Sequence, residues 1–252
     1  PLPGVRITLI TRDVHTPYSG MLPGYIAGHY DFDETHIDLR PLAMFAGARI
    51  YHDEAISIDH ASNKVICLNR PPVAFDILSV NVGSTPSMTT PGADAFVTPV
   101  KPINNFLDRW EALSARAMSQ EGPMRIAVVG AGAGGVEILL AIQHRLGRLR
   151  AAAGKPPDNI EFHLFSNTEH ILPTHNTKVR AAFLKTLQHR NVVLHLGEPV
   201  TQVEPGILRT DAGDAIAAQE ILWVTAAGAP DWPAKAGIDT DAGGFIKVTD
   251  TL

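Results

Sequence analysis

The feature that most constrains this chain is a glycine-rich turn between an apolar strand and a long helix. The turn lies within residues 126–142, "IAVVGAGAGGVEILLAI", where Gly130, Gly132 and Gly135 match the pattern G-x-G-x-x-G. In that pattern the first glycine permits a tight turn, the second lets the backbone approach a pyrophosphate, and the third allows the helix to pack closely on the strand. The predicted phosphate-binding residues are Gly130, Ala131, Gly132, Ala133, Gly134 and Gly135.

The segments around this turn support a nucleotide site. The strand "RIAVV" precedes it, a helix over about 134–150 follows, and a second strand covers about 160–165. This is a βαβ unit, which favours a right-handed crossover in a parallel sheet. Free N–H groups and the positive end of the helix dipole would receive phosphates. A glycine-rich turn without a ligand is the alternative, and the flanking strand and helix weigh against it.

Two further positions bear on the ligand. The second strand ends in Ser166 and Asn167, where a dinucleotide site usually carries an acid for the adenosine ribose. Either residue could contact the ribose, and a plain strand-end turn is an equal alternative, so the choice between NAD and NADP stays open. We place Glu137 in the first turn of the helix, where the dipole favours an acid with or without a ligand.

Composition excludes several classes of function. The net charge of −5 is mild and the basic residues are scattered, which argues against a nucleic-acid partner. Cys67 is the only cysteine, so the sequence has no internal disulfide, no C-x-x-C pair and no multi-cysteine metal site. We read it as a buried thiol in a strand. The histidines are dispersed without ligand spacing, and we predict no metal. No apolar run approaches the roughly 20 residues that span a bilayer, so a cytoplasmic protein is the default.

The rest of the chain predicts a β-rich region and several helices. We expect strands at 5–11, 48–51, 55–59, 64–69 and 75–82, helices at 39–46, 103–120 and 177–189, and mostly strands after residue 190. We read "TPYSGMLPGYIAGHY" as a loop rich in proline and glycine. Both ends of the sequence lie within strand patterns, and we expect the chain to be an internal part of a longer protein.

The ordered set of motifs resembles one known family. The segments "TPYSGMLPG", "NVGSTP", "VKPI", "VVGAGAGGVE", "LFSNTEHILPTHN", "WVTAAGAP" and "GGFIKVTDTL" occur in this order. Together they resemble the FAD-dependent pyridine nucleotide-disulfide oxidoreductase superfamily. The likeness is to its type II NADH dehydrogenase and sulfide:quinone reductase branch, especially the NADH-dehydrogenase-like proteins associated with selenide, water dikinase. The resemblance runs the whole length, and "TPYSGMLPG" is its most specific segment.

The resemblance implies an α/β fold with a Rossmann-like NAD(P)-binding domain inserted into an FAD-binding domain. That arrangement explains why a dinucleotide turn falls in the middle of the chain. We expect an FAD-binding part over 1–121 that lacks its first glycine turn, an NAD(P)H-binding domain over 122–228, and a return to the FAD-binding domain over 229–252. Because the first glycine turn and a later Gly-Asp motif are absent from the sequence, we expect weak FAD binding or none.

The resemblance also assigns cofactor contacts. Glu137 matches an acid near the nicotinamide ribose. Two strand-end loops near the cofactors match at Gly83, Ser84, Thr85 and Pro86, and at Ala226, Ala227 and Gly228. The loop that approaches the isoalloxazine matches Tyr18, Ser19, Gly20, Met21, Leu22 and Pro23. Thr11, followed by Arg12, occupies the place where the family often has an acid for the FAD ribose. Lys101 in "VKP" could face the flavin, although an ordinary solvated lysine is the simpler reading.

The implied chemistry is hydride transfer from NAD(P)H to FAD, followed by electron delivery to a quinone or another acceptor. The cofactors carry this reaction, so we nominate no catalytic side chain. A chain with one cysteine supplies no redox pair, which favours a dehydrogenase over a disulfide or sulfide reductase. The alternative is a regulatory or interaction module that binds NAD(P)H without redox turnover. The resemblance leaves room for a homodimer and for peripheral contact with the inner face of a membrane.

Overall fold

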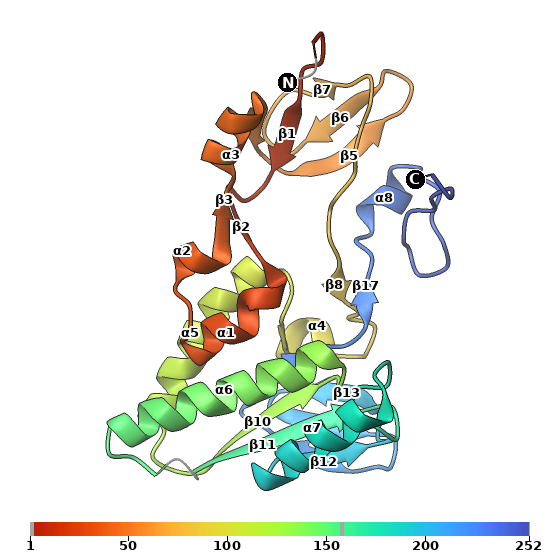
Figure 1. The fold of residues 1–252 in the computed structure, drawn as a ribbon. Helices are drawn as coiled ribbons and strands as arrows, with labels where there is room; N and C mark the ends of the chain where they lie inside the picture. The colour runs from red at the N-terminus through yellow and green to blue at the C-terminus, as the bar shows by residue number, and fades with distance from the viewer. Residues whose placement is uncertain (1–2, 157–158, 252) are drawn as a thin grey trace. The chain divides into compact units, whose positions relative to one another are not determined.

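The structure is a computed structural model that describes residues 3–156 and 159–251 (Figure 1). The chain forms two compact units. Unit 1 comprises residues 1–18, 32–84 and 228–252, and unit 2 comprises residues 19–31 and 85–227. The chain leaves unit 1 after Ser84 and returns to it at Gly228, so most of unit 2 is inserted into unit 1. Unit 2 therefore contains residues 122–227 of the range 122–228 that was predicted as a domain, together with segments before it, and Gly228 falls in unit 1.

Unit 2 is built on a five-stranded sheet in the order β12-β11-β10-β16-β9. All four neighbouring pairs are parallel. The strands are β9 (Thr98–Pro99), β10 (Met124–Val129), β11 (Ile160–Ser166), β12 (Val193–Leu196) and β16 (Glu220–Trp223). A parallel sheet with crossover helices is the Rossmann-like arrangement, and the α/β prediction is confirmed.

The central strands are apolar because both faces of the sheet are covered. On one face lie α5 (Ile103–Ser119), α6 (Ala133–Ala152) and α7 (Thr177–His189), whose apolar residues share one core with Ile126, Val128 and Leu164. On the other face, Ala127, Val129 and Phe165 belong to a second core. Alternate residues of one strand thus enter different cores, as the two-residue period of a strand requires.

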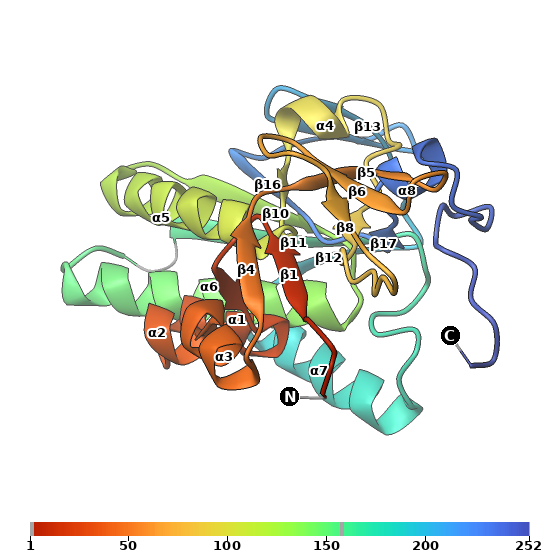
Figure 2. The same ribbon diagram turned by 90° about the horizontal axis from the view of Figure 1, so that it is seen from above.

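The second core is completed by strands instead of a helix. The antiparallel strands β13 (Val200–Glu204), β14 (Ile207–Thr210) and β15 (Ala215–Ala217) form a meander, joined by α4 (Ala93–Phe96). Figure 2 shows α4 and β13 on the side of the sheet opposite to α6 and α7. The sequence-based prediction that strands dominate after residue 190 is confirmed here.

One segment predicted as a loop is helical, so that prediction was wrong. Residues Ser19–Met21 form η1 and Leu22–Ala27 form α1, which ends at Gly28 with a left-handed φ of 79°. Proline is tolerated in the first helical turn, and glycine after the last turn satisfies the helix end. Leu22 and Ile26 are four residues apart and are buried in the core that contains α6. Packing against α6 therefore decided the conformation of this segment.

The described residues of unit 1 form three small sheets. Strands β1 and β4 pair in parallel, β2 and β3 pair antiparallel, and β5, β6 and β7 form an antiparallel sheet. These strands are β1 (Thr8–Thr11), β2 (His15–Pro17), β3 (His36–Asp38), β4 (Arg49–His52), β5 (Ala55–Asp59), β6 (Lys64–Cys67) and β7 (Val73–Ala74). The helices are α2 (Phe32–Thr35), α3 (Leu39–Ala46) and α8 (Trp232–Lys235). Short strands β8 (Thr85–Pro86) and β17 (Ala227–Gly228) pair where the chain passes between the units.

Several details of unit 1 match the sequence-based expectations and one does not. Helix α3 ends at Gly47 in the left-handed region, and Cys67 is buried in β6. The strand predicted at 75–82 is wrong, because these residues form no strand and Ile77 is 92% exposed. A strand needs a backbone partner, and sequence alone does not show whether one is within reach. None of the helices in the described residues combines the length and apolar composition needed to cross a bilayer.

Candidate nucleotide-binding site

A pocket of about 710 Å³ lies within unit 2 at the carboxyl ends of the parallel strands. Its lining includes Val129 at the end of β10, Phe165 near the end of β11, Trp223 at the end of β16 and Val100 just after β9. In open α/β sheets this edge is where ligands bind. The volume is within the range of about 300–1,000 Å³ that small-molecule pockets occupy.

The structure brings together more than half of the predicted site residues. Those that line the pocket are Ser19, Leu22, Pro23, Thr85, Pro86, Gly130, Ala131, Gly132, Gly134, Glu137, Ser166, Asn167 and Ala227. Those of unit 2 that do not line it are Gly20, Met21, Ala133 and Gly135. The others belong to unit 1 and are Thr11, Arg12, Tyr18, Gly83, Ser84 and Gly228. Thr11 donates its hydroxyl to the carbonyl oxygen of Asp13 at 2.8 Å, and Arg12 pairs with Asp13 at 3.2 Å.

Two glycines of the turn are required by the protein itself. Gly130 has a φ of 114°, and a Cβ atom there would overlap the carbonyl oxygen of Val224. A Cβ atom at Gly135 would overlap the carbonyl oxygen of Gly130. The backbone cannot move away from these contacts without disturbing β16 and the start of α6. The first and third glycines of the motif are therefore explained by packing.

Gly132 has no such explanation. Its φ of −71° and ψ of −178° are open to any residue, and a Cβ atom there would meet no protein atom within 4 Å. Gly132 lines the pocket and is the N-cap of α6. The N–H groups of the first helical turn lack acceptors in the same helix, and the helix dipole makes this end favourable for an anion. The missing side chain leaves room for a group to approach these N–H donors, so the residues present fit a pyrophosphate.

The helix begins earlier than predicted, which changes the reading of Glu137. Helix α6 starts at Ala133, so Glu137 is its fifth residue and the first turn contains no acid. The prediction that Glu137 lies in the first turn was wrong, because three small residues of the glycine turn are already helical. Dipole stabilisation is weak beyond the first turn. Glu137 lines the pocket.

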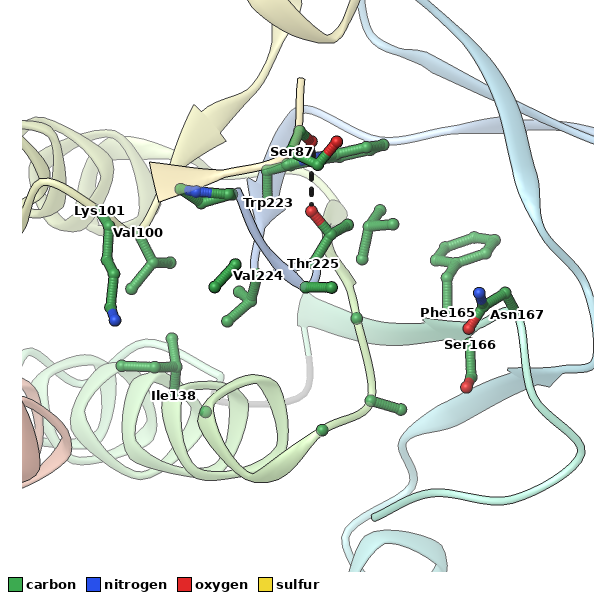
Figure 3. Close-up of a pocket in the computed structure, with 18 of the residues that line it drawn as sticks. Ser87, Val100, Lys101, Ile138, Phe165, Ser166, Asn167, Trp223, Val224 and Thr225 are labelled. Carbon is green, nitrogen blue, oxygen red and sulfur yellow. Dashed lines mark hydrogen bonds between the residues drawn. The ribbon is translucent and has the colours of Figure 1, made fainter. Parts of the chain in front are cut away.

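One end of the pocket is apolar and carries, among the described residues, one cationic side chain. Val100, Ile138 and Val224 line this end, and Figure 3 shows Lys101 extending from the end of β9 toward Ile138 of α6. The sequence left two readings of Lys101, a residue that faces the flavin and an ordinary solvated lysine, and in the structure Lys101 is exposed and lines the pocket. Its place in the pocket comes from β9, a two-residue strand that the sequence did not reveal.

The other end of the pocket is polar and follows β11. Phe165, Ser166 and Asn167 lie together there (Figure 3). The Ser166 hydroxyl lies 2.8 Å from the hydroxyl of Thr168 and accepts the Thr168 backbone N–H at 3.2 Å. Ser166 is therefore occupied in a strand-end turn, whereas Asn167 is exposed. Glu198, from the loop after β12, also lines this end.

A hydrogen-bonded group of side chains adjoins this polar end. His195 Nε2 lies 2.9 Å from His163 Nδ1, and His195 Nδ1 lies 3.1 Å from Glu198 Oε2. On the far side, His163 Nε2 lies 3.2 Å from Glu161 Oε2. Burial lowers the pKa of His163, against the opposing effect of the Glu161 carboxylate. A hydrogen bond from Arg125 holds the pKa of Glu161 below its usual value.

In the middle of the pocket, Trp223 and Thr225 form hydrogen bonds to the same backbone oxygen. Trp223 donates its indole N–H to the carbonyl oxygen of Ser87 at 2.8 Å. Thr225 donates its hydroxyl to the same oxygen at 3.3 Å, which Figure 3 draws as a dashed line. These bonds connect the end of β16 to the segment after β8, and all three residues line the pocket. The motif "WVTAAGAP" was the sequence signal for this region.

A further part of the lining was missed from the sequence. Leu172 donates its backbone N–H to Ala131 at 2.8 Å, which brings Pro173 and Thr174 to the pocket. Leu172 has a φ of 51°, an uncommon conformation for a leucine. The proline in "HILPTHN" marks this segment in the sequence, but its contact with the glycine turn is tertiary.

Comparison with known proteins agrees with this architecture. The family described as pyridine nucleotide-disulphide oxidoreductase matches residues 3–252. The chain belongs to the pyridine nucleotide-disulphide oxidoreductase family. The family predicted from the ordered motifs is thereby confirmed. No curated protein matched the chain in a sequence search.

Solved structures share the fold of this pyridine nucleotide-disulphide oxidoreductase at low sequence identity. NDH2 from Plasmodium falciparum in complex with NADH has a TM-score of 0.81 at 15% identity, covering 89% of this chain and 51% of that one. The sulfide:quinone oxidoreductase from Aquifex aeolicus has a TM-score of 0.72 at 17% identity, covering 94% and 56%. A NAD-dependent persulfide reductase from A. fulgidus has a TM-score of 0.75 at 16% identity, covering 96% and 45%. The chain thus spans about half the length of these proteins.

Proposed function

We propose that this chain is part of an FAD-dependent oxidoreductase that takes hydride from NAD(P)H, and that the pocket of unit 2 binds the NAD(P)H. The observation that carries the proposal is the open space over Gly132 on the pocket lining. The residue is a glycine although neither its backbone angles nor its surroundings require one. Family membership and the fold shared with an NADH complex support the same ligand.

Each part of the pocket has a role in this proposal. The glycine turn and the first turn of α6 would hold the pyrophosphate through backbone N–H groups. The polar end at Asn167 would hold the adenosine ribose. The apolar end at Val100, Ile138 and Val224 would exclude water around the nicotinamide, and Glu137 on α6 would contact its ribose.

Two observations support the part of the proposal that concerns FAD, namely membership of the family and the place of several predicted flavin contacts on the pocket lining. FAD, when bound, accepts the hydride and passes electrons onward. Ser19, Leu22, Pro23, Thr85 and Pro86 line the pocket of unit 2 and would be the flavin-facing residues of this unit. We propose a quinone or another external acceptor, because a single buried cysteine offers no redox pair. The type II NADH dehydrogenase and sulfide:quinone reductase branch fits this choice.

The direct test is the affinity of the purified protein for NADH and NADPH, measured by calorimetry. We expect Gly132→Val to weaken binding at least a hundredfold, because the side chain would fill the space through which pyrophosphate reaches the backbone. Loss of two charge-assisted hydrogen bonds at about 1.5–3 kcal/mol each accounts for that factor.

A matched variant separates ligand contact from folding. Gly147 lies in the middle of α6, does not line the pocket and also has no protein atom within 4 Å of an added Cβ. We expect Gly147→Val to bind NADH as the wild type does, and both variants to keep the circular dichroism of the fold. Unchanged NADH affinity in Gly132→Val would refute the proposed binding mode. A full-length protein that binds NADH but carries no flavin would instead be a sensing module.

A further inference from the structure

The strand end that usually supplies an acid to a dinucleotide has none in this chain. β11 ends in Ser166 and Asn167, and the hydroxyl of Ser166 is engaged by Thr168. The adenosine ribose of NAD ordinarily pairs with a carboxylate at this point, whereas NADP is accommodated by a nearby arginine. The lining of the pocket must therefore provide a different recognition group.

Glu198 reaches the same place from the next strand. β12 runs parallel to β11 with Leu196 opposite Ser166, so the residues that follow both strands emerge at one edge of the sheet. The backbone N–H of Glu198 donates to the carbonyl oxygen of Ser166 at 3.0 Å, and that of Gly197 donates to Thr168 at 2.9 Å. These two bonds fix the Glu198 backbone directly beside the end of β11, and Glu198 lines the pocket.

The two carboxylate oxygens of Glu198 differ, because only Oε2 has a hydrogen-bond partner among the described residues. His195 Nδ1 lies 3.1 Å from Oε2, and the His195 ring stacks on Phe165 with centroids 4.1 Å apart and planes 4° apart. Across the described residues, Oε1 of Glu198 has no hydrogen-bond partner. One oxygen is thus positioned by a packed imidazole, and the other is available for a ligand hydroxyl.

Charge decides which ligand this end accepts. Glu198 is an acid at the polar end, and Lys101 is the only lysine or arginine that lines the pocket within the described part of the chain. Figure 3 shows Lys101 at the end of the pocket opposite Ser166 and Asn167. A 2′-phosphate would face a carboxylate without a compensating cation, whereas a free 2′-hydroxyl can donate to that carboxylate.

We propose that Glu198 binds the adenosine ribose hydroxyls of NADH and makes this pocket select NADH over NADPH. The inference rests on the proposed function, since it names the substrate of the same pocket. It assigns the acid to the loop after β12 instead of the end of β11, with His195 as the positioning residue.

The test compares NADH with NADPH, and 5′-AMP with 2′,5′-ADP, by calorimetry on the whole chain. We expect the wild type to bind NADH at least tenfold more tightly than NADPH. In Glu198→Gln, which keeps size and removes charge, we expect this ratio to fall at least tenfold, with the same trend for the two shorter probes. A general loss of structure would weaken both members of each pair and leave the ratio unchanged.

The control is Glu169→Gln. Glu169 is exposed, lies beside Gly197 and does not line the pocket. We therefore expect the ratio of NADH to NADPH affinity in this variant to stay within about twofold of the wild type. Binding of NADH with an unchanged ratio in Glu198→Gln, or a wild type that prefers NADPH, overturns the role of Glu198 and leaves the proposed function standing. A wild type that binds neither nucleotide overturns both.

Discussion

The carbonyl oxygen of Gly130 occupies the space that a Cβ atom at Gly135 would need. The first glycine of the motif thereby dictates the third, because the turn folds back onto the helix that it starts. Gly132, between them, is free of this constraint and borders the pocket. One motif thus contains glycines of two kinds, and substitutions should separate them.

We expect Gly135→Ala to destabilise the protein by about 1–3 kcal/mol or more, because the overlap is with backbone that cannot rotate away. Gly132→Ala should change the free energy of unfolding by no more than about 0.5–1 kcal/mol, the difference between glycine and alanine at an N-cap. Urea unfolding followed by circular dichroism measures both. Equal costs for the two variants would contradict this division.

A smaller effect on ligand affinity is expected at Glu137. The residue lines the pocket from the second turn of α6, and Glu137→Ala would remove only a ribose contact. A single lost hydrogen bond at about 0.5–1.5 kcal/mol corresponds to roughly two- to tenfold weaker NADH binding. Calorimetry beside Gly132→Val gives the comparison. An effect as large as that of Gly132→Val would mean that Glu137 does more than contact the ribose.

Arg150 should contribute strongly to stability although no carboxylate of the described residues pairs with it. Its side chain is 1% exposed and donates to the carbonyl oxygens of Ala117 and Gln120, at the carboxyl end of α5, and to that of Pro156 in the segment after α6. A cation is favourable at that end of a helix. We expect Arg150→Met to cost about 2–4 kcal/mol, because buried carbonyls lose their donors. A loss below about 1 kcal/mol in urea unfolding would show that water replaces the guanidinium.

Stability should fall on mild acidification. The pKa of His163 is lowered mainly by burial, so the unfolded chain takes up a proton first as the pH drops. The contribution of His163 to the free energy of unfolding is therefore at its maximum above the ordinary histidine pKa of about 6.5, and it decreases below that pH. His144 has a lowered pKa with the same sign.

We expect His163→Asn to flatten part of this pH dependence, since asparagine keeps a polar atom near the position of Nδ1 and cannot be protonated. Urea midpoints at about pH 7, 6 and 5 measure the slope. His144 supplies the remaining slope in the variant. An identical slope in wild type and variant would show that His163 is already accessible to protons in the folded state.

Sequence-based prediction succeeded where the determinants are local. The periodicity of apolar residues predicted the strand before Gly130 and the helix after it. Glycine at position 47 predicted the end of α3, where the backbone is left-handed. The pocket residues on this turn were predictable for the same reason. The start of α6 was misplaced by a residue, which moved Glu137 out of the first turn, because small residues carry little information on helix limits.

The other outcomes depended on distant partners. Leu22 and Ile26 are helical because α6 offers them a core, and residues 75–82 form no strand although their sequence resembles one. His163 and His195 are 32 residues apart and meet only because β11 and β12 pair in parallel. The same pairing places Glu198 beside Ser166.

The amino-acid sequence by itself determined the strand, the glycine turn and the helix, because their backbone angles and periodicity are properties of neighbouring residues. Only the tertiary structure decided which side chains share the pocket with that turn. The register of parallel strands depends on how both faces of the sheet are packed, and no short stretch of sequence carries that information. Without the tertiary structure, Glu198 of the loop after β12 could not have been placed beside the end of β11.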